Sequence, residues 1–367
     1  MRSLDHESTD HELTGHGLLD RGLPGRALMA RALAGRPGPG PEELRAARVA
    51  LHFEGGLGDT RALTFAELDA EVGRAAAALS ALGVGPGDRV GIYLPVIPEA
   101  VVAVLACTLL GAVPAAVFGL FDGARPVLPG LRDLGAEVVI TADGSIRPGP
   151  PAPAGAPQRH GTPVALKPAV DAALAGCPRV RHVLVVRRTG RPVPWQDGRD
   201  LWWHERVEQA DAGPGLPPPH PGGYGDDPEL LGLRPGSDVY WCTGEVGWLG
   251  GRPYGVFGAL AAGVTQVLCE SGPPAGVRGR LWETVERYGV TFLHTEPAAV
   301  ELLLSRGDEL TRRHDLSGLR ALCRLTGSAV GPVRVLHRIR DWTGRARAWE
   351  SCAHPVGAAP QPDRALS

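Results

Sequence analysis

Strand signals alternate with helix signals along this chain, and the stretch from Asp238 to Glu270 shows the repeating unit most clearly. A short β-prone segment, 238–243, predicts a strand, and Gly250-Gly251 opens the segment that follows it. Apolar residues from Tyr254 to Ala261 then recur at helical spacing, and Thr265 to Cys269 predicts a second buried strand. The turn of such a unit lies at the carboxyl end of a strand, where open α/β sheets usually bind ligands. The spacing alone fits an ordinary strand–helix–strand repeat equally well.

The same alternation runs through the first half of the chain. Thr64 and Glu67 form a capping-box pattern ahead of an apolar helical stripe that Gly83 ends. A second helix is expected from Pro98, a favoured residue in a first helical turn, to Gly111. Further strands are predicted at 89–94, 113–118, 137–141 and 290–295, and further helical stretches at 127–134 and 297–306. The predicted fold is α/β, with two subdomains of mostly parallel sheets flanked by helices.

Composition divides the chain into four predicted parts. Residues 1–45 lack apolar periodicity and end near a Gly- and Pro-rich run, so we expect a disordered leader. The first α/β subdomain is expected over 46–215 and the second over 216–350, and 351–367 would form a tail.

Charge and cysteine content limit the partners and the cellular compartment that can be expected for this chain. A net charge of -2 gives no electrostatic basis for binding nucleic acid or a membrane surface, so neither partner is expected. The 6 cysteines form no C-x-x-C pair, which favours free thiols in a reducing, cytoplasmic compartment. The uncharged run from Ala100 to Phe121 is long enough to span a bilayer, but Gly111 and Pro114 interrupt it. We therefore expect a buried helix followed by a buried strand.

The sequence motifs in the 238–270 stretch resemble those of a known family. WCTGEVGWLGGRPYGVFGALAAGVTQVLCE is similar to the signature of the AMP-forming acetyl-CoA and propionyl-CoA synthetases, which are adenylate-forming acyl ligases. LTFAELDAEVGRAAAALSALGVGPGDRVGIYLPVIPEAVV resembles the first subdomain of the same family. The resemblance implies the family's large N-terminal domain, without the small C-terminal domain. It also implies a reaction in which a short-chain carboxylate and ATP give an acyl-adenylate, and the thiol of coenzyme A then displaces AMP.

Four residues are candidate site residues through this resemblance alone. Trp248 matches the tryptophan that bounds the acyl pocket, and Trp349 and Ser351 match the segment that holds the adenylate. Arg147, in ADGSIRPG, matches an arginine that meets the phosphate-bearing end of coenzyme A, although the second arginine of that loop is replaced by Pro150. ATP, coenzyme A and magnesium are the cofactors of the family.

Other family positions are missing or altered. The phosphate-binding loop of the family, T-S-G-S-T-G-x-P-K-G, is absent where ERVEQADAGPGLPPP runs directly into HPGGYG. Cys352 replaces the magnesium carboxylate, and a thiol is a poor ligand for a cation that prefers oxygen. Lys167, the only lysine in the chain, matches a structural position of the family. No catalytic residue and no metal ligand is therefore assigned.

Three hypotheses follow. In the first, the chain is an acetyl-CoA synthetase-like protein that has lost its ligase activity. In the second, it is an active short-chain acyl-CoA ligase completed by another chain. In the third, it is a non-catalytic module that binds a nucleotide, coenzyme A, another small molecule or an intact acyl-CoA ligase.

Overall fold

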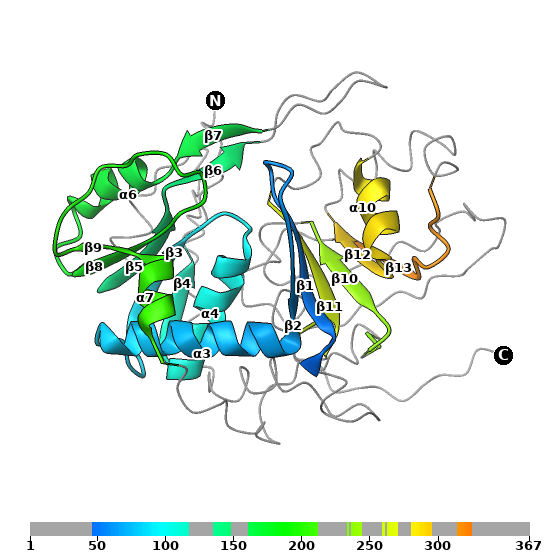
Figure 1. Ribbon diagram of the computed structural model, residues 1–367, viewed down its shortest axis with the longest axis horizontal. Coiled ribbons are helices and arrows are strands. Elements are labelled where there is room, and N and C mark those ends of the chain that lie inside the picture. Colours follow the sequence, from blue (N-terminus) through cyan, green and yellow to red (C-terminus); the bar gives the residue numbers. More distant parts are fainter. Residues whose placement is uncertain are drawn as a thin grey trace, which may run out of the picture.

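Two sheets of mainly parallel strands organise the protein, as Figure 1 shows for the computed structural model. The structure describes residues 46–116, 135–147, 161–211, 233–234, 236–243, 259–260, 263–270, 280–295 and 314–324. Helices flank both sheets, so the predicted α/β class is confirmed.

The first sheet has five strands in the order β4-β3-β5-β8-β9, and every neighbouring pair is parallel. Its central strand β5 is buried along its whole length, as expected for a parallel sheet covered on both faces. The strands are β3 (Arg89–Tyr93), β4 (Val113–Ala116), β5 (Val138–Ala142), β8 (His182–Val186) and β9 (Asp200–Trp202).

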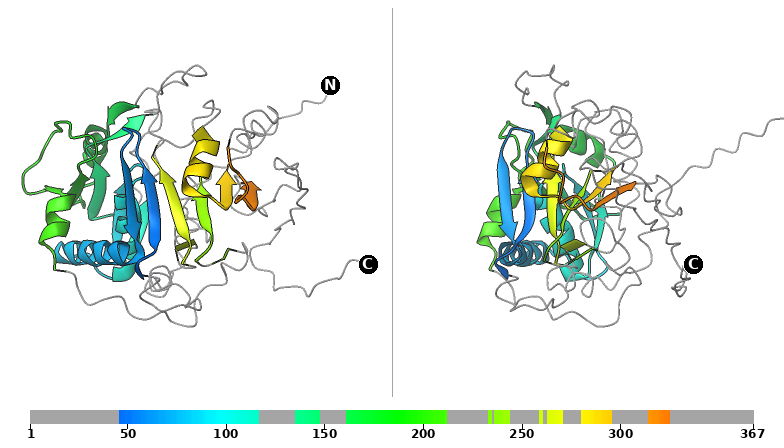
Figure 2. Two further views of the ribbon diagram at one scale, coloured as in Figure 1. Left: turned by 45° about the vertical axis from the view of Figure 1, so that its right-hand side comes forward. Right: turned by 90° about the vertical axis from the view of Figure 1, so that its right-hand side faces the viewer.

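The second sheet has six strands in the order β13-β12-β10-β11-β1-β2. Only the hairpin partner β2 runs antiparallel, because β1 pairs in parallel with β11. An early hairpin thus completes a sheet built from the second half of the chain, and Figure 2 shows it in blue beside the later strands. The strands are β1 (Val49–Glu54), β2 (Thr60–Thr64), β10 (Val239–Cys242), β11 (Thr265–Cys269), β12 (Phe292–Thr295) and β13 (Ala321–Arg324).

Five helices and a small hairpin complete the described elements. The helices are α3 (Phe65–Ala81), α4 (Pro98–Leu110), α6 (Lys167–Leu174), α7 (Trp203–Gln209) and α10 (Arg280–Tyr288). The hairpin pairs β6 (Gly144–Arg147) with β7 (Thr162–Ala165). Helix α4 is buried from Pro98 to Thr108 except at Glu99, and it ends at Gly111, whose φ of 72° suits glycine. The buried helix predicted there is confirmed, and no helix in the described part of the chain is long and apolar enough to cross a membrane.

Two apolar cores lie against these sheets. The larger core joins the five-stranded sheet, α3 and α4 to the β1–β2 hairpin. The smaller core packs α10, through Trp282, against the other face of the six-stranded sheet. Successive β11 residues alternate between them, since Val267 belongs to the smaller core and Leu268 to the larger one. The six-stranded sheet therefore separates the two cores.

The predicted capping box begins α3. The Thr64 hydroxyl accepts a hydrogen bond from the Glu67 backbone N–H at 3.2 Å, and the Glu67 carboxylate accepts one from the Thr64 backbone N–H at 2.8 Å. These bonds satisfy donors that would lack partners at the helix start.

We expect Thr64→Ala to lower the free energy of unfolding by about 1 kcal/mol, because the helix start loses its side-chain acceptor. Thr64→Ser keeps the hydroxyl and should unfold within a few tenths of a kcal/mol of the unmodified protein. Urea unfolding followed by circular dichroism measures both, and equal loss in the two variants would contradict a capping role.

Most predicted strands and helices that fall on described residues are confirmed within one or two residues. The predicted helical stretches at 127–134 and 297–306 lie outside those residues, as does nearly all of the one at 254–261. The structure additionally contains strands that the sequence patterns did not single out, including β1, β2 and β8.

Candidate functional site

The carboxyl ends of strands from both sheets meet at one place. β8 leads into Arg188 and β5 into Asp143, while β11 leads into Glu270, whose backbone N–H donates to the Glu54 carbonyl at the end of β1. In open α/β sheets, ligands bind outside the carboxyl ends of the strands. This convergence is therefore the candidate functional site.

Arg188 joins the two sheets through two carboxylates. Its Nε donates to Glu270 Oε1 at 2.8 Å, and its Nη1 and Nη2 donate to Asp59 at 2.8 and 3.0 Å. Nη2 also donates to Glu270 Oε2, which in turn accepts the Gly56 backbone N–H at 2.9 Å. All three guanidinium nitrogens are thus bonded to carboxylates that lie in the other sheet's strand ends or turn.

The electrostatics follow from this pairing. Burial alone would lower the pKa of Arg188, but the hydrogen bonds and charges of Glu270 and Asp59 outweigh it and raise that pKa. Burial acts to raise the pKa of Asp59, but its bonds with Arg188 and with backbone N–H groups lower it overall. Both groups therefore remain charged over a wide pH range.

Asp143 builds the turn that carries Arg188. Its carboxylate accepts backbone N–H groups from Arg188 at 2.9 Å, Thr189 at 2.9 Å and Gly190 at 2.7 Å. Asp143 is itself buried. A buried carboxylate with three amide donors is well satisfied, so it holds the end of β8 in one conformation.

Gly144 starts the strand that leads to Arg147. A Cβ at Gly144 would lie 2.6 Å from the Val164 carbonyl oxygen, so only glycine fits this close approach of β7. The backbone of Arg147 then pairs with Thr162 at the end of the hairpin. The Asp143 turn therefore fixes the start of the strand that carries Arg147, the residue predicted to contact coenzyme A.

The other predicted site residues cannot be placed against this geometry. Trp248, Trp349 and Ser351 lie outside the described residues, as do Pro150 and Cys352. Within the described ranges, no group of three or more His, Cys, Asp or Glu side chains could hold a metal ion.

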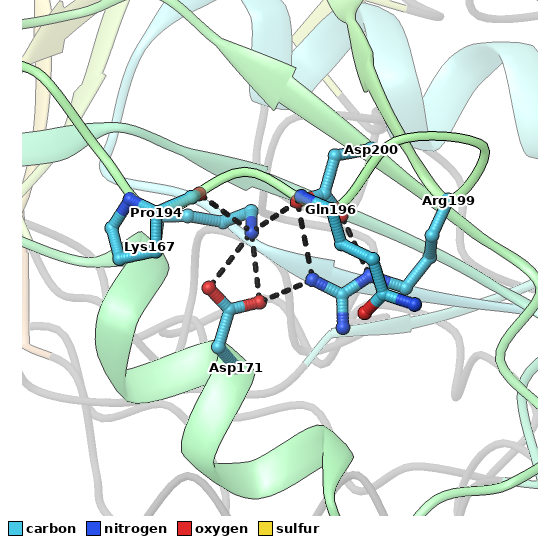
Figure 3. Close-up of polar contacts among 6 residues, drawn as sticks. All are labelled: Lys167, Asp171, Pro194, Gln196, Arg199 and Asp200. Atoms are coloured by element: carbon cyan, nitrogen blue, oxygen red, sulfur yellow. Dashed lines mark hydrogen bonds and ion pairs between the residues drawn. The ribbon is translucent and has the colours of Figure 1, made fainter.

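Lys167 lies in a different cluster, shown in Figure 3. Its Nζ donates to both Asp171 oxygens at 2.8 Å and to Asp200 Oδ2 at 2.7 Å, and the side chain is completely buried. Burial acts to raise the pKa of Asp200, but hydrogen bonds from Arg199, Lys167 and the Gln196 backbone lower it overall. The cluster lies at the amino end of β9, away from the candidate site.

Sequence reasoning did not single out the residues that organise the candidate site. Asp143 follows β5 directly, Glu270 follows β11 directly, and Arg188 is the second residue after β8. A search for charged residues just beyond the predicted strand ends would have found Asp143 and Glu270, but not Arg188, because β8 was not among the predicted strands. Asp59 carries no such signal, because it lies in the β1–β2 turn and its partner is remote in sequence.

The two α/β sheets have the arrangement of an adenylate-forming fold, as the likeness to a solved acetoacetyl-CoA synthetase shows. Residues 42–222 and 225–351 match the family of AMP-binding enzymes, so the chain belongs to that family.

Its relatives include acetyl-coenzyme A synthetases. The chain is 44% identical over 303 residues to the enzyme of Streptomyces avermitilis, covering 75% of this chain and 44% of that protein. It is 42% identical over 318 residues to the enzyme of Mycobacterium tuberculosis strain H37Rv, covering 78% of this chain and 46% of that protein. Among solved structures it resembles acetoacetyl-CoA synthetase from Streptomyces lividans, with a TM-score of 0.63 and 28% identity over 81% of this chain and 46% of the other. The chain thus spans less than half the length of these relatives.

Proposed function

We propose that this acetyl-CoA synthetase-like chain does not form an acyl-adenylate by itself. The single observation that carries the proposal is the position of its only lysine. Lys167 is fully buried, bonded to two aspartates and located at the amino end of β9. An ammonium group there cannot contact a phosphate at the carboxyl ends of the strands.

The described strand ends also fit the phosphates of ATP poorly. Two carboxylates, from Asp59 and Glu270, bond the single guanidinium of Arg188, while a third carboxylate, that of Asp143, bonds the backbone N–H of Arg188. Arg188 already donates from every nitrogen to these acids, so it would have to break the link between the sheets to bind a phosphate. In addition, the sequence lacks the Gly-rich loop that cradles phosphates in the family it resembles. We therefore derive no step through ATP or magnesium on these residues.

The loss of such groups is expected to abolish adenylation. Phosphoryl and adenylyl chemistry depends mainly on positioning and on stabilising charge, and loss of one preorganised donor typically costs about a hundred- to a thousand-fold in rate. A phosphate loop and a phosphate-contacting lysine act on the same oxygens, so their losses do not simply multiply. The remaining rate should still lie near background.

Acetate-dependent exchange between ATP and pyrophosphate in the presence of magnesium tests the proposal. We expect no exchange above background from the full chain, with an acetyl-CoA synthetase of a related bacterium as the positive control. Circular dichroism and a cooperative melt on the same sample establish that the chain is folded. Exchange by the folded chain alone would overturn the proposal.

A binding role is the second candidate function, and the preformed Asp143 turn supports it. This turn fixes the start of the strand that carries Arg147. The contact between Arg147 and the phosphate-bearing end of coenzyme A would then be retained in a chain that has lost catalysis. We expect calorimetry with coenzyme A to show binding that Arg147→Ala weakens about tenfold, the loss typical of a charge-assisted contact. Exchange activity that appears only when an intact acyl-CoA ligase is added would instead support completion by a partner chain.

A cytoplasmic location is part of this proposal, and the free, buried thiols of Cys107 and Cys177 support a reducing compartment.

A further inference from the structure

An open hollow of about 510 Å³ lies beside the Lys167 cluster, at the opposite end of the five-stranded sheet from the candidate site. The segments that line it precede β8 and β9, so it lies at the amino ends of these strands. Its lining combines apolar surface with a short polar edge; the residues that matter below are Leu174, Pro178, Trp195, Asp171 and Arg199.

Trp195 gives the hollow a fixed aromatic wall. It is 39% exposed, and only one other large hydrophobic side chain in the described residues, Leu57, is equally exposed. Its ring stacks on Trp202 with centroids 4.6 Å apart, and the guanidinium of Arg187 lies 4.5 Å from the Trp202 centroid. Stacking of this kind orients the indole while leaving part of it open to the hollow.

Arg199 gives the hollow a hydrogen-bond donor. Its Nε donates to Asp200 at 2.7 Å and its Nη2 to Asp171 at 2.6 Å, whereas Nη1 contacts no acceptor among the described residues. Figure 3 shows this third nitrogen without a contact to the residues drawn.

Asp171 provides an acceptor next to that donor. It also lines the hollow, and it is joined to Arg199 through Nη2. Lys167 and Arg199 balance the charges of Asp171 and Asp200, so the polar edge is neutral as a whole. A charged ligand would disturb this balance, whereas a neutral one would not.

We propose that the hollow is a binding site for a flat, neutral molecule that stacks on Trp195 and presents an acceptor beside a donor to Arg199 and Asp171. Carboxamides on an aromatic ring and nucleobases have this chemistry. The site is independent of the strand-end site and of its activity. Bound there, such a molecule would contact the loop before β9 and helix α6 together.

Three probes with the same ring test the proposal. Benzamide offers one acceptor and one donor, benzoate only acceptors, and benzamidine only donors. We expect ¹⁹F spectra of protein containing 5-fluorotryptophan to show a Trp195 shift with benzamide. Benzoate and benzamidine should bind at least about tenfold more weakly, because each faces a like charge or an unpaired group. Equal binding of all three probes would overturn the assigned polar edge.

Substitutions at Trp195 test the stacking wall. Trp195→Ala should weaken benzamide binding at least about tenfold, whereas Trp195→Phe, which keeps a ring, should retain most of it. Leu57→Ala removes the other exposed large side chain and should leave the affinity unchanged. Unchanged binding in a folded Trp195→Ala variant would overturn the proposal, and so would the absence of any benzamide-induced shift at the Trp195 resonance.

Discussion

Lys167→Met is expected to lower the free energy of unfolding by about 3 kcal/mol. Methionine fills the space of the lysine stem but leaves Asp200, whose side chain has no exposed surface, without its ammonium partner. We place the loss at the lower end of the range for broken buried ion pairs because Arg199 and the Gln196 backbone still donate to Asp200. Urea unfolding followed by circular dichroism measures the change.

A double-mutant cycle separates this ion pair from general packing. Asp200→Asn combined with Lys167→Met should destabilise less than the sum of the two single variants, by at least about 1 kcal/mol. The pH dependence gives a second check: the lowered pKa of Asp200 contributes stability that is present above its unfolded value and is lost as the pH falls through the folded value. In Lys167→Met, which loses one of the bonds that lower this pKa, the decline should begin at a higher pH. Strictly additive effects would contradict the assigned pairing.

Arg188→Ala is expected to cost about 3–5 kcal/mol, because it leaves the fully buried Glu270 carboxylate without its charged partner. The free energy of unfolding of Arg188→Lys should fall between that of Arg188→Ala and that of the unmodified protein. A single ammonium cannot replace a planar guanidinium that bonds two carboxylates. The pKa of Asp59, followed by ¹³C NMR, should rise towards its ordinary value in Arg188→Ala.

Arg181 provides the matched control. It forms an ion pair with Glu137 at 2.6 Å, but both side chains are about half exposed. Arg181→Ala should therefore change stability by about 0–1 kcal/mol. If Arg181→Ala and Arg188→Ala cost the same, the link between the two sheets would have no special energetic role.

Much of the fold could be predicted because its local signals agree. Thr64 and Glu67 marked the start of α3, Pro98 and Gly111 bounded α4, and a short β-prone segment after Gly263 marked β11. Each of these signals acts within a few residues, so a single sequence contains it. The pairing of β1 with β11 was not predictable in this way, because strand pairing between distant segments depends on the three-dimensional arrangement.

Less of the candidate site could be predicted from the sequence. Resemblance singled out Arg147, but it could not indicate that Asp143 forms the turn ahead of it through three backbone amides. The bond between Arg188 and Asp59 joins positions 129 residues apart, and neither residue lies in a distinctive pattern. Lys167 was recognised as structural, yet its partner Asp200 was not, because Asp200 lies 33 residues further along the chain, beyond β8.

The place of β1 in the second sheet has a consequence for how the chain is made. A ribosome synthesises β1 early, but the β11 strand beside it comes much later, as the 216 positions between Val49 and Thr265 indicate. All five strands of the other sheet leave the ribosome in the meantime and can pair with one another. During that interval the inner edge of β1 has unpaired backbone groups and is open to wrong partners. Closure of the six-stranded sheet is therefore a late step of biosynthesis, and a chaperone that shields the first hairpin would protect the nascent chain when it is most prone to aggregate.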